Sequence, residues 1–493
     1  MNPHNEIEED EELLRQMGYA QELRRRMSGF SNFAISMSTI CILAGGVTSF
    51  HLGLCGAGGA TIGLGWPMVS LFSLVVAMTM GQVASAYPTA GGLYHWSSIL
   101  GGRGWGWVTA WFNLAGLVTV LAAINVGTYA FAMATFGDLL GIQPERLGPN
   151  GPLIAQGVGV LLITGAQALI NHLGIRLTTA LTDLSGGLIV GVSMALTVAL
   201  LFYAPSFEPA RLVTFADYSG SAGDNVWPFT RSSAWLFVLG FLLPAYTITG
   251  FDASAHSAEE TVGAAANVPR GMVRAVAVSG FAGWILLSAV ILAAPSLDEA
   301  AAQGERSFAW ILSSTLPSGL NLVLNAGIVL VQFGCGLAAM TSSSRMTYAF
   351  ARDGGLPWSD LWKGVSPTRR TPVAAIWGVA AMAVAFTLWT PVYATITAVC
   401  TIFLYISYVI PTSLGALAYG RTWTRMGPWD LGRWYRPLAL INAVGCILLI
   451  AIGMQPPYDR AGWILAGSLI LLAVAWFGRE RRRFPGPAVL TAD

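Results

Sequence analysis

A single acid interrupts one of the apolar runs of the chain. Asp252 lies in LPAYTITGFDASAHSAEE, which covers residues 243–260. A charged group in such a run marks a solute pathway, an ion pathway or a proton relay, because burying it in lipid is costly. An aspartate can also serve only as the N-cap of a helical segment that begins after an interruption. The sequence leaves open whether Asp252 exchanges a proton or only caps a half-helix.

The residues before Asp252 favour an interruption of the helix. Gly250 is permissive in its backbone conformation, and the two threonine hydroxyls can bond to carbonyls that an interrupted helix leaves free. The acids Glu259 and Glu260 follow at the end of the run, where we expect a solvated face. The predicted interruption covers Tyr246, Thr247, Ile248, Thr249 and Gly250.

The first apolar run, NFAISMSTICILAGGVTSFHLGL, carries a matching feature near its middle. Its adjacent glycines favour an interruption, although small residues also mark faces where membrane helices pack. Gly46 and Gly250 are 204 residues apart. Paired interrupted segments in corresponding halves point to a solute site built on inverted repeats. The candidate residues here are Ala44, Gly45, Gly46 and Val47.

Further polar side chains lie deep in apolar runs. Asn113 and Asn125 share the third run, and Tyr405 lies in the tenth. Such groups either line a cavity or hydrogen-bond between helices. We take Asn125 and Tyr405 forward as candidates for solute binding.

The eighth run closes with hydroxyls and a base. Four consecutive hydroxyl residues that begin with Thr341 and Ser342 are unusual for a lipid-facing surface, and Arg345 follows them directly. An arginine within a membrane needs a partner. Asp183 or Glu259 could supply it. These residues are candidates for coupling or gating.

The composition requires a membrane around these runs. Hydrophobic residues make up 54% of the 493 residues and charged ones 10%, which predicts a polytopic all-α membrane protein. A crossing needs about 20 mostly apolar residues, and twelve runs qualify. They cover 32–54, 61–85, 104–134, 153–170, 178–203, 233–255, 272–294, 320–350, 372–389, 393–419, 437–454 and 463–477.

The basic residues test this segmentation. With twelve crossings, 21 of the 26 lysines and arginines fall on the side of the two termini and five on the other. Short cytoplasmic loops hold the excess of such residues. Both termini are therefore expected in the cytoplasm, with the protein in the cytoplasmic membrane and the first run retained as a span. The five on the other side are Arg146, Arg211, Arg231, Arg306 and Arg460.

Several classes of chemistry are excluded by the inventory of residues. The only lysine, Lys363, is followed by Gly364, so no nucleotide-binding Gly-Lys-Ser/Thr loop exists. The five histidines are scattered, which argues against a metal site, and the five cysteines show no disulfide spacing. We expect no enzyme activity, no cofactor and no nucleic-acid partner.

Three runs resemble a known superfamily: ASAYPTAGGLYHWSSILGG at 84–102, TGFDASAHSAEETVGAAANVPRGMV at 249–273 and SSSRMTYAFARDGGLPWS at 342–359. They are similar to the amino acid–polyamine–organocation superfamily and within it to the amino acid/choline permeases. The resemblance covers all twelve spans. It implies the leucine-transporter fold, with spans one to five and six to ten as inverted repeats and with spans one and six interrupted.

The resemblance also implies an organisation and a site. Cytoplasmic segments at 1–27 and 479–493 would flank a core at 28–420, with repeats at about 28–204 and 230–420, and two added spans at 421–478. Backbone N–H groups at 44–47 would receive a carboxylate, and carbonyls at 246–250 would receive an amine. Asp252 matches an acidic position after the second interruption. Gln82 stands where a carboxylate is expected in the family, which puts the role of that acid in doubt here.

The expected activity is secondary transport of an amino acid, gamma-aminobutyrate or a related small amine by alternating access. Choline or a polyamine is the alternative, and a channel or a transporter-like sensor is a more distant one. Transport is expected to be linked to protons or to be an exchange. Thr341 and Ser342, with carbonyls of the first span, could instead bind sodium as in relatives of the fold. Besides the lipid bilayer, a second copy of the chain is a partner that the sequence leaves open.

Overall fold

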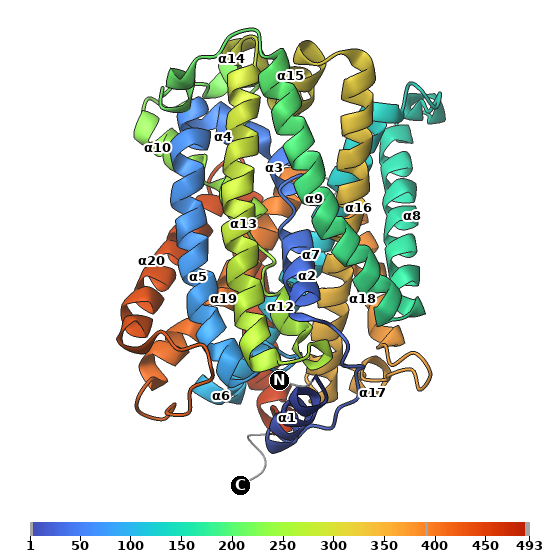
Figure 1. The fold of residues 1–493 in the computed structure, drawn as a ribbon, viewed down its shortest axis with the longest axis vertical. Helices are drawn as coiled ribbons and strands as arrows, with labels where there is room; N and C mark the ends of the chain where they lie inside the picture. Colours follow the sequence, from blue (N-terminus) through green and yellow to red (C-terminus); the bar gives the residue numbers. More distant parts are fainter. Residues whose placement is uncertain (1–2, 390–392, 489–493) are drawn as a thin grey trace.

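The computed structural model of the chain describes residues 3–389 and 393–488. Almost all of this part is helical, and both ends of the chain lie at the same end of the molecule (Figure 1). We call this the terminal end and the other the opposite end. The outermost residues of the two predicted terminal segments, 1–2 and 489–493, lie outside the described residues.

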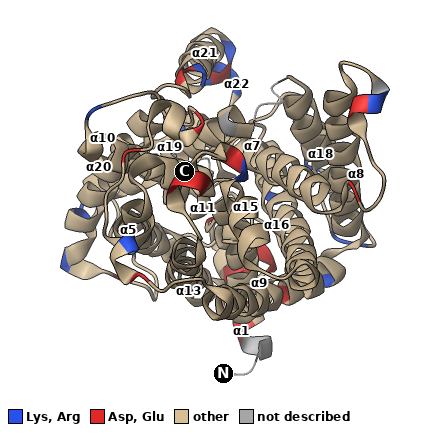
Figure 2. Cartoon of the chain, turned by 90° about the horizontal axis from the view of Figure 1, so that it is seen from above, with Lys and Arg blue, Asp and Glu red and all other residues tan. Residues whose placement is uncertain are grey.

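Ten helical segments of the described chain are long and apolar enough to cross a membrane. Two shorter apolar segments, Ser233–Thr247 and Val373–Trp389, lie where the sixth and ninth spans were predicted. Each predicted span overlaps a helix, so the multi-pass architecture is confirmed, while the count of twelve crossings stays a prediction. Charged residues are sparse along the ribbon in the view from above (Figure 2).

Two of the predicted spans are interrupted and lie in the centre of the molecule. The first consists of α2 (Gly29–Ile40), α3 (Gly45–Thr48) and α4 (Phe50–Ala57). The second consists of α10 (Ser233–Leu239), α11 (Leu242–Thr247) and α12 (Ala253–His256). Helix α11 packs against α3 and α4, and α12 packs against α2, so the two interruptions lie side by side. An interruption at membrane depth is tolerated where protein buries it.

Long uninterrupted helices surround this centre. Helices α5 and α13 pack together on one side, and α7 packs against both α16 and α19 on the other. Their apolar side chains form one continuous core around the interrupted spans. The bounds are α5 Trp66–Ala86, α7 Arg103–Phe136, α13 Ala264–Ala293, α16 Ser318–Arg352 and α19 Tyr393–Ala418.

The remaining helices lie at the periphery or at the two ends (Figure 1). Only 6% of the most apolar 18 residues in the last long helical segment, Asp459–Arg483, are buried inside the protein, so this segment is available to lipid. The peripheral helices are α8 Gly151–Leu173, α9 Ile175–Tyr203, α18 Val373–Trp389, α20 Tyr435–Gly453 and α21 Asp459–Ala475. The end helices are α1 Pro3–Gln16, α6 Leu93–Gly101, α14 Leu297–Ala301, α15 Ser307–Thr315, α17 Ser359–Trp362 and α22 Arg481–Arg483.

Candidate functional site

The first interruption lies slightly before the predicted residues. The chain leaves helix α2 at Cys41, whose φ of 32° is left-handed, and becomes helical again at Gly45. Only Ala44 of the predicted segment 44–47 belongs to the interruption, and the other three residues open the next helical turn. No described residue accepts a hydrogen bond from the N–H groups of Gly46 or Val47. These N–H groups are therefore free to bind an anionic group.

The two adjacent glycines of α3 have different surroundings. A Cβ at Gly45 would lie 2.9 Å from the Cα of Thr247, so the two interrupted spans touch through their backbones there. A Cβ at Gly46 would have no contact closer than 3.7 Å, to the side chain of Leu287. The close approach of the spans therefore explains Gly45.

The second interruption follows Thr247 and centres on Gly250. Its φ of +81° is a conformation that L side chains rarely adopt. No described group donates a hydrogen bond to the carbonyls of Thr247, Ile248 or Thr249. The hydroxyls of Thr247 and Thr249 bond instead to the carbonyls of Leu243 and Tyr246. Three free carbonyls at the end of α11 offer acceptors for an ammonium group.

Asp252 does not cap α12 with its side chain. The fully buried carboxylate accepts hydrogen bonds from Tyr408 of α19 at 2.8 Å and from Asn113 of α7 at 3.1 Å. Its Oδ2 also lies 3.2 Å from Nε2 of His256. The Tyr408 hydroxyl accepts the N–H of Gly250 at 3.0 Å, so one hydroxyl joins the acid to the second interruption.

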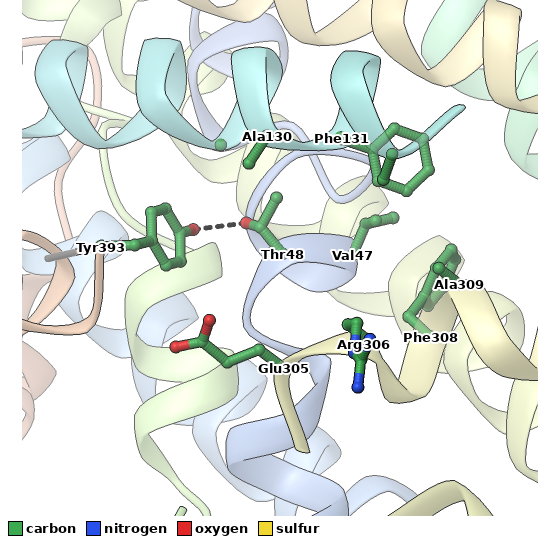
Figure 3. A pocket seen from close by; sticks show the side chains of 11 residues that line it. Val47, Thr48, Ala130, Phe131, Glu305, Arg306, Phe308, Ala309 and Tyr393 are labelled. Atoms are coloured by element: carbon green, nitrogen blue, oxygen red, sulfur yellow. Dashed lines mark hydrogen bonds between the residues drawn. The ribbon is translucent and has the colours of Figure 1, made fainter. Parts of the chain in front are cut away.

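A cavity of about 180 Å³ lies between α3 and residues 305–309 of the opposite end, and Figure 3 shows the side chains that line it. Val47 and Thr48 of α3 line it, together with Phe131 of α7 and Glu305. The hydroxyls of Thr48 and Tyr393 are hydrogen-bonded to each other. Tyr393 also donates to the hydroxyl of Tyr246 at 3.5 Å. This chain of three hydroxyls joins α3, α19 and α11.

Two buried ion pairs lie between the interruptions and the terminal end. Arg345 binds both carboxylate oxygens of Glu260, at 2.9 and 3.1 Å. Arg352 binds both oxygens of Glu259, at 2.9 and 3.0 Å. The expectation of a solvated face for these two acids is wrong, because both are fully buried and paired with arginines of α16.

The predicted partners of Arg345 are also wrong. Asp183 accepts a hydrogen bond from Ser31, and Glu259 pairs with Arg352. The 3-10 turn Ala258–Glu260 places the two neighbouring acids against two arginines that are two helical turns apart on α16. A sequence pattern does not reveal which acid meets which base.

Residues 10–27, which we call the N-terminal strap, cover the terminal end. Asp10 accepts the N–H groups of Gly263 and Ala264 at the start of α13 and pairs with Arg25 at 3.4 Å. Burial raises the pKa of the Asp10 carboxyl, while the Arg25 charge and the two N–H donors lower it by less. Arg25 also donates to the carbonyls of Ala258 and Thr261.

An aromatic residue within this strap, Tyr19, binds it to the end of α16. The Tyr19 hydroxyl bonds to Asp353 at 3.0 Å, and the Arg352 guanidinium lies 4.0 Å from the centre of the Tyr19 ring. Tyr94 and His95 of α6 bond to the same Asp353 carboxylate, each at 2.9 Å. The strap, α6 and α16 are therefore joined at one point.

Other predicted site residues lie apart from the interruptions. Asn125 and Gln167 exchange a pair of amide hydrogen bonds, so Asn125 joins α7 to α8. Thr341 donates to Asn171 and to a carbonyl of its own helix, and Ser342 donates to Ala338. Tyr405 donates to the carbonyl of Ala245 at 3.3 Å, which places it beside α11.

Three residues of this centre were not predicted from the sequence. Thr48 directly follows the predicted segment 44–47 in the first run, Tyr393 begins the tenth run, and neither carries a motif. His256 was counted only among the scattered histidines. The signal for His256 was its spacing of four residues from Asp252, which places both side chains on one helical face. Within the described residues, no group of three His, Cys, Asp or Glu side chains could hold a metal ion.

Interrupted helices with free backbone groups, enclosed by long apolar helices, define a carrier of small solutes. The particular family follows from the sequence: the family model for amino acid permeases matches residues 27–476. The chain therefore belongs to the amino acid permease family, in the amino acid–polyamine–organocation superfamily, and is an integral membrane transporter of an amino acid or amine.

Curated relatives extend over nearly the whole chain. Amino-acid permease BAT1 of Arabidopsis thaliana is 33% identical, with 96% of this chain and 95% of the relative covered. Its rice homologue is 30% identical over 96% and 94%. A Candida albicans protein that is provisionally named a polyamine transporter is 26% identical over 99% and 90%.

Proposed function

We propose that the protein moves an amino acid or gamma-aminobutyrate across the cytoplasmic membrane by alternating access. The observation that carries this proposal is the pair of adjoining interruptions with complementary free backbone groups. N–H groups at Gly46 and Val47 favour a carboxylate, and carbonyls at Thr247, Ile248 and Thr249 favour an amine. A solute that carries both groups satisfies both interruptions.

The difference between the closed terminal end and the opposite end, which holds a cavity, supports alternating access. The buried ion pairs and the N-terminal strap close the terminal end, whereas a cavity reaches the three-hydroxyl chain of Thr48, Tyr393 and Tyr246 from the other side. Spans one to five and six to ten act in this proposal as inverted repeats that rock around the two interruptions. The excess of basic residues at the terminal end supports a cytoplasmic position for that end.

The coupling in this proposal is to protons or to a second solute in exchange. A fully buried acid that shares a hydroxyl with the second interruption supports a proton-linked cycle. Choline or a polyamine is the alternative solute. The relative provisionally named a polyamine transporter favours that alternative. Among the described residues, Asp252 is the only acid hydrogen-bonded next to an interruption, and a single acid favours a solute with one amine over a polyamine.

The test is uptake into proteoliposomes across labelled amino acids, gamma-aminobutyrate, choline and putrescine, each with and without proton and sodium gradients. We expect a solute with both an amine and a carboxylate to be transported, and the pH gradient to drive it. Uptake of choline or putrescine alone would select the alternative. Transport of none of them would contradict the proposal.

A single substitution tests the acid. Asp252→Asn keeps the size of the side chain but cannot ionise, so we expect it to lose accumulation driven by a pH gradient. Asp183→Asn is the matched control, because Asp183 bonds to Ser31 on another helix. Sodium-dependent uptake that ignores pH and survives Asp252→Asn would contradict the proposed proton linkage.

A further inference from the structure

His256 is held between an acid and a backbone carbonyl. Its Nε2 lies 3.2 Å from Oδ2 of Asp252, and its Nδ1 lies 3.2 Å from the carbonyl oxygen of Ala90. All of the side-chain atoms of Asp252 and His256 are buried. A carbonyl oxygen only accepts, so Nδ1 must carry a proton for its contact to be a hydrogen bond.

This tautomer fixes how many protons the pair contains. With Nδ1 protonated, the contact of Nε2 with Asp252 needs one further proton. Either a neutral Asp252 donates to a neutral imidazole, or an imidazolium donates to the carboxylate. Without that proton, a carboxylate oxygen would face the lone pair of the ring nitrogen. With both contacts made as hydrogen bonds, the pair therefore holds one exchangeable proton.

We propose that Asp252 and His256 together hold the coupling proton, and that this proton keeps the terminal end closed. The inference rests on the proposed transport function. When the proton leaves, the imidazole can bond to Asp252 or to Ala90, but not to both. The loop that contains Ala90 then loses its connection to the segment behind the second interruption.

The loop at Ala90 connects the pair to the terminal end. The N–H of Ala90 donates to Glu259 at 3.1 Å, and Glu259 is paired with Arg352. The Ala90 side chain packs with Leu23 of the N-terminal strap in a small apolar cluster. A Cβ placed on Gly92, whose φ is +46°, would lie 3.4 Å from the imidazole, so a side chain at this position would be in contact with the ring of His256.

The same pair also senses the second interruption. The Tyr408 hydroxyl accepts from Gly250 and donates to Asp252, so a shift of Gly250 on solute binding changes a hydrogen bond of the acid. Solute, proton and terminal closure are thus joined through consecutive hydrogen bonds from Gly250 to Glu259.

Other charged groups around the pair already have partners or face away. Glu259 and Glu260 are paired with Arg352 and Arg345 of α16, and His95 is bonded to Asp353. Helix α2 contributes no titratable side chain, α7 presents the neutral Asn113, and α19 presents the Tyr408 hydroxyl. The bases near the start of α13, Arg270 and Arg274, are exposed.

The first test measures accumulation in proteoliposomes with the membrane potential clamped at zero. One pH unit across the membrane permits about tenfold accumulation by a carrier that moves one proton per neutral solute. We expect this from the unmodified protein and from His51→Gln, a buried histidine of α4. His256→Gln should equilibrate solute without accumulating it, yet still exchange labelled for unlabelled solute.

The outcomes separate the two proposals. Absence of any transport by the unmodified protein counts against the proposed function. Normal transport by the unmodified protein with full accumulation by His256→Gln overturns the inference, as does uptake that ignores the pH gradient in the unmodified protein.

A second measurement does not depend on transport. The five native cysteines are buried, so Ala90→Cys provides a reporter for opening of the terminal end. Its maleimide labelling rate, divided by that of the exposed control Asp360→Cys, should be higher at alkaline pH than at acidic pH, because the closing proton is lost as the pH rises. In the His256→Gln background this ratio should stay flat. An equal rise in both backgrounds would overturn the inference.

Discussion

Gly45 and Gly46 are adjacent, but only one of them has backbone from the other interrupted span against it. A Cβ at Gly45 meets the Thr247 backbone, which cannot move aside without shifting α11. A Cβ at Gly46 would only be in ordinary van der Waals contact with the side chain of Leu287. Gly45 therefore sets the distance between the two interrupted spans, whereas Gly46 leaves room beside the free N–H groups.

The first prediction compares these two glycines. Gly45→Ala should push α3 away from α11, because the added methyl meets the Thr247 backbone. Overpacking of this kind costs about 1–3 kcal/mol. The substitution should therefore lower both the melting temperature in detergent and solute uptake. Gly46→Ala should fold and transport nearly as the unmodified protein. Equal effects of the two substitutions would contradict the assigned contact.

The second prediction concerns Gly250. A side chain there meets Cγ2 of Thr39 at 2.5 Å, and the left-handed backbone adds about 1–2 kcal/mol of strain. Gly250→Val should abolish uptake while the protein still reaches the membrane, as judged by surface expression. In a Gly250→Ala background, Thr39→Ser removes the clashing methyl but not the backbone strain. The second substitution should therefore restore solute uptake only in part.

The third prediction concerns the ion pair of Arg345 with Glu260. Removing one partner of a buried pair costs about 3–5 kcal/mol because the other charge stays uncompensated. Arg345→Met should therefore lower the melting temperature strongly, and the double variant with Glu260→Leu should recover part of the loss. Lys363→Met breaks an exposed pair with Asp360 and should have almost no effect.

The elements differ in how far their roles could be predicted. Apolar runs of about 20 residues predict membrane helices because the bilayer sets their length, and the glycines indicated two interruptions. The first interruption lies before the predicted segment 44–47, because its left-handed residue is Cys41 and no conformational propensity of cysteine favours that backbone. The partners of Arg345, and the contacts of His256 and Tyr393, depend on how distant helices pack, so no local pattern contained them.

The N-terminal strap is an element whose attachment depends on pH. The pKa of Asp10 in the attached strap is raised above its usual value of 3.8, chiefly by burial. The attached form therefore binds a proton more strongly than the free form, and attachment weakens as the pH rises from 3.8 to the raised pKa. Above that pKa no further change comes from this group.

The fourth prediction follows from this sign. Limited proteolysis within residues 10–27 should become faster as the pH rises through the acidic range, and Asp10→Asn should remove that dependence. The variant keeps an acceptor for the N–H groups of Gly263 and Ala264, so the helix cap is retained. A dependence of the opposite sign would contradict the raised pKa.

In the whole molecule, the excess of basic residues and the contacts that close the protein are found at the same end. The basic residues gather at the terminal end, and the N-terminal strap and buried ion pairs close that end. The opposite end has the cavity. The structure thus represents a carrier that is closed toward the side on which the termini lie.

The fifth prediction tests the orientation. In intact cells, a membrane-impermeant maleimide should label a cysteine at Ala222, exposed in the loop before α10, and should leave Asp360→Cys unlabelled until the cells are opened. The native cysteines give little background because all five are buried. The reverse pattern would place the termini outside the cell.

We expect the cavity beside Thr48 and Tyr393 to make inhibition of this carrier depend on the side from which a compound is added. Its 180 Å³ correspond to about six waters in the liquid. A small rigid compound that fits between Val47 and Phe308 without separating the two hydroxyls would hold the protein in this conformer. Such a compound would act only from the opposite side, and would block net uptake and solute exchange equally, without itself being transported.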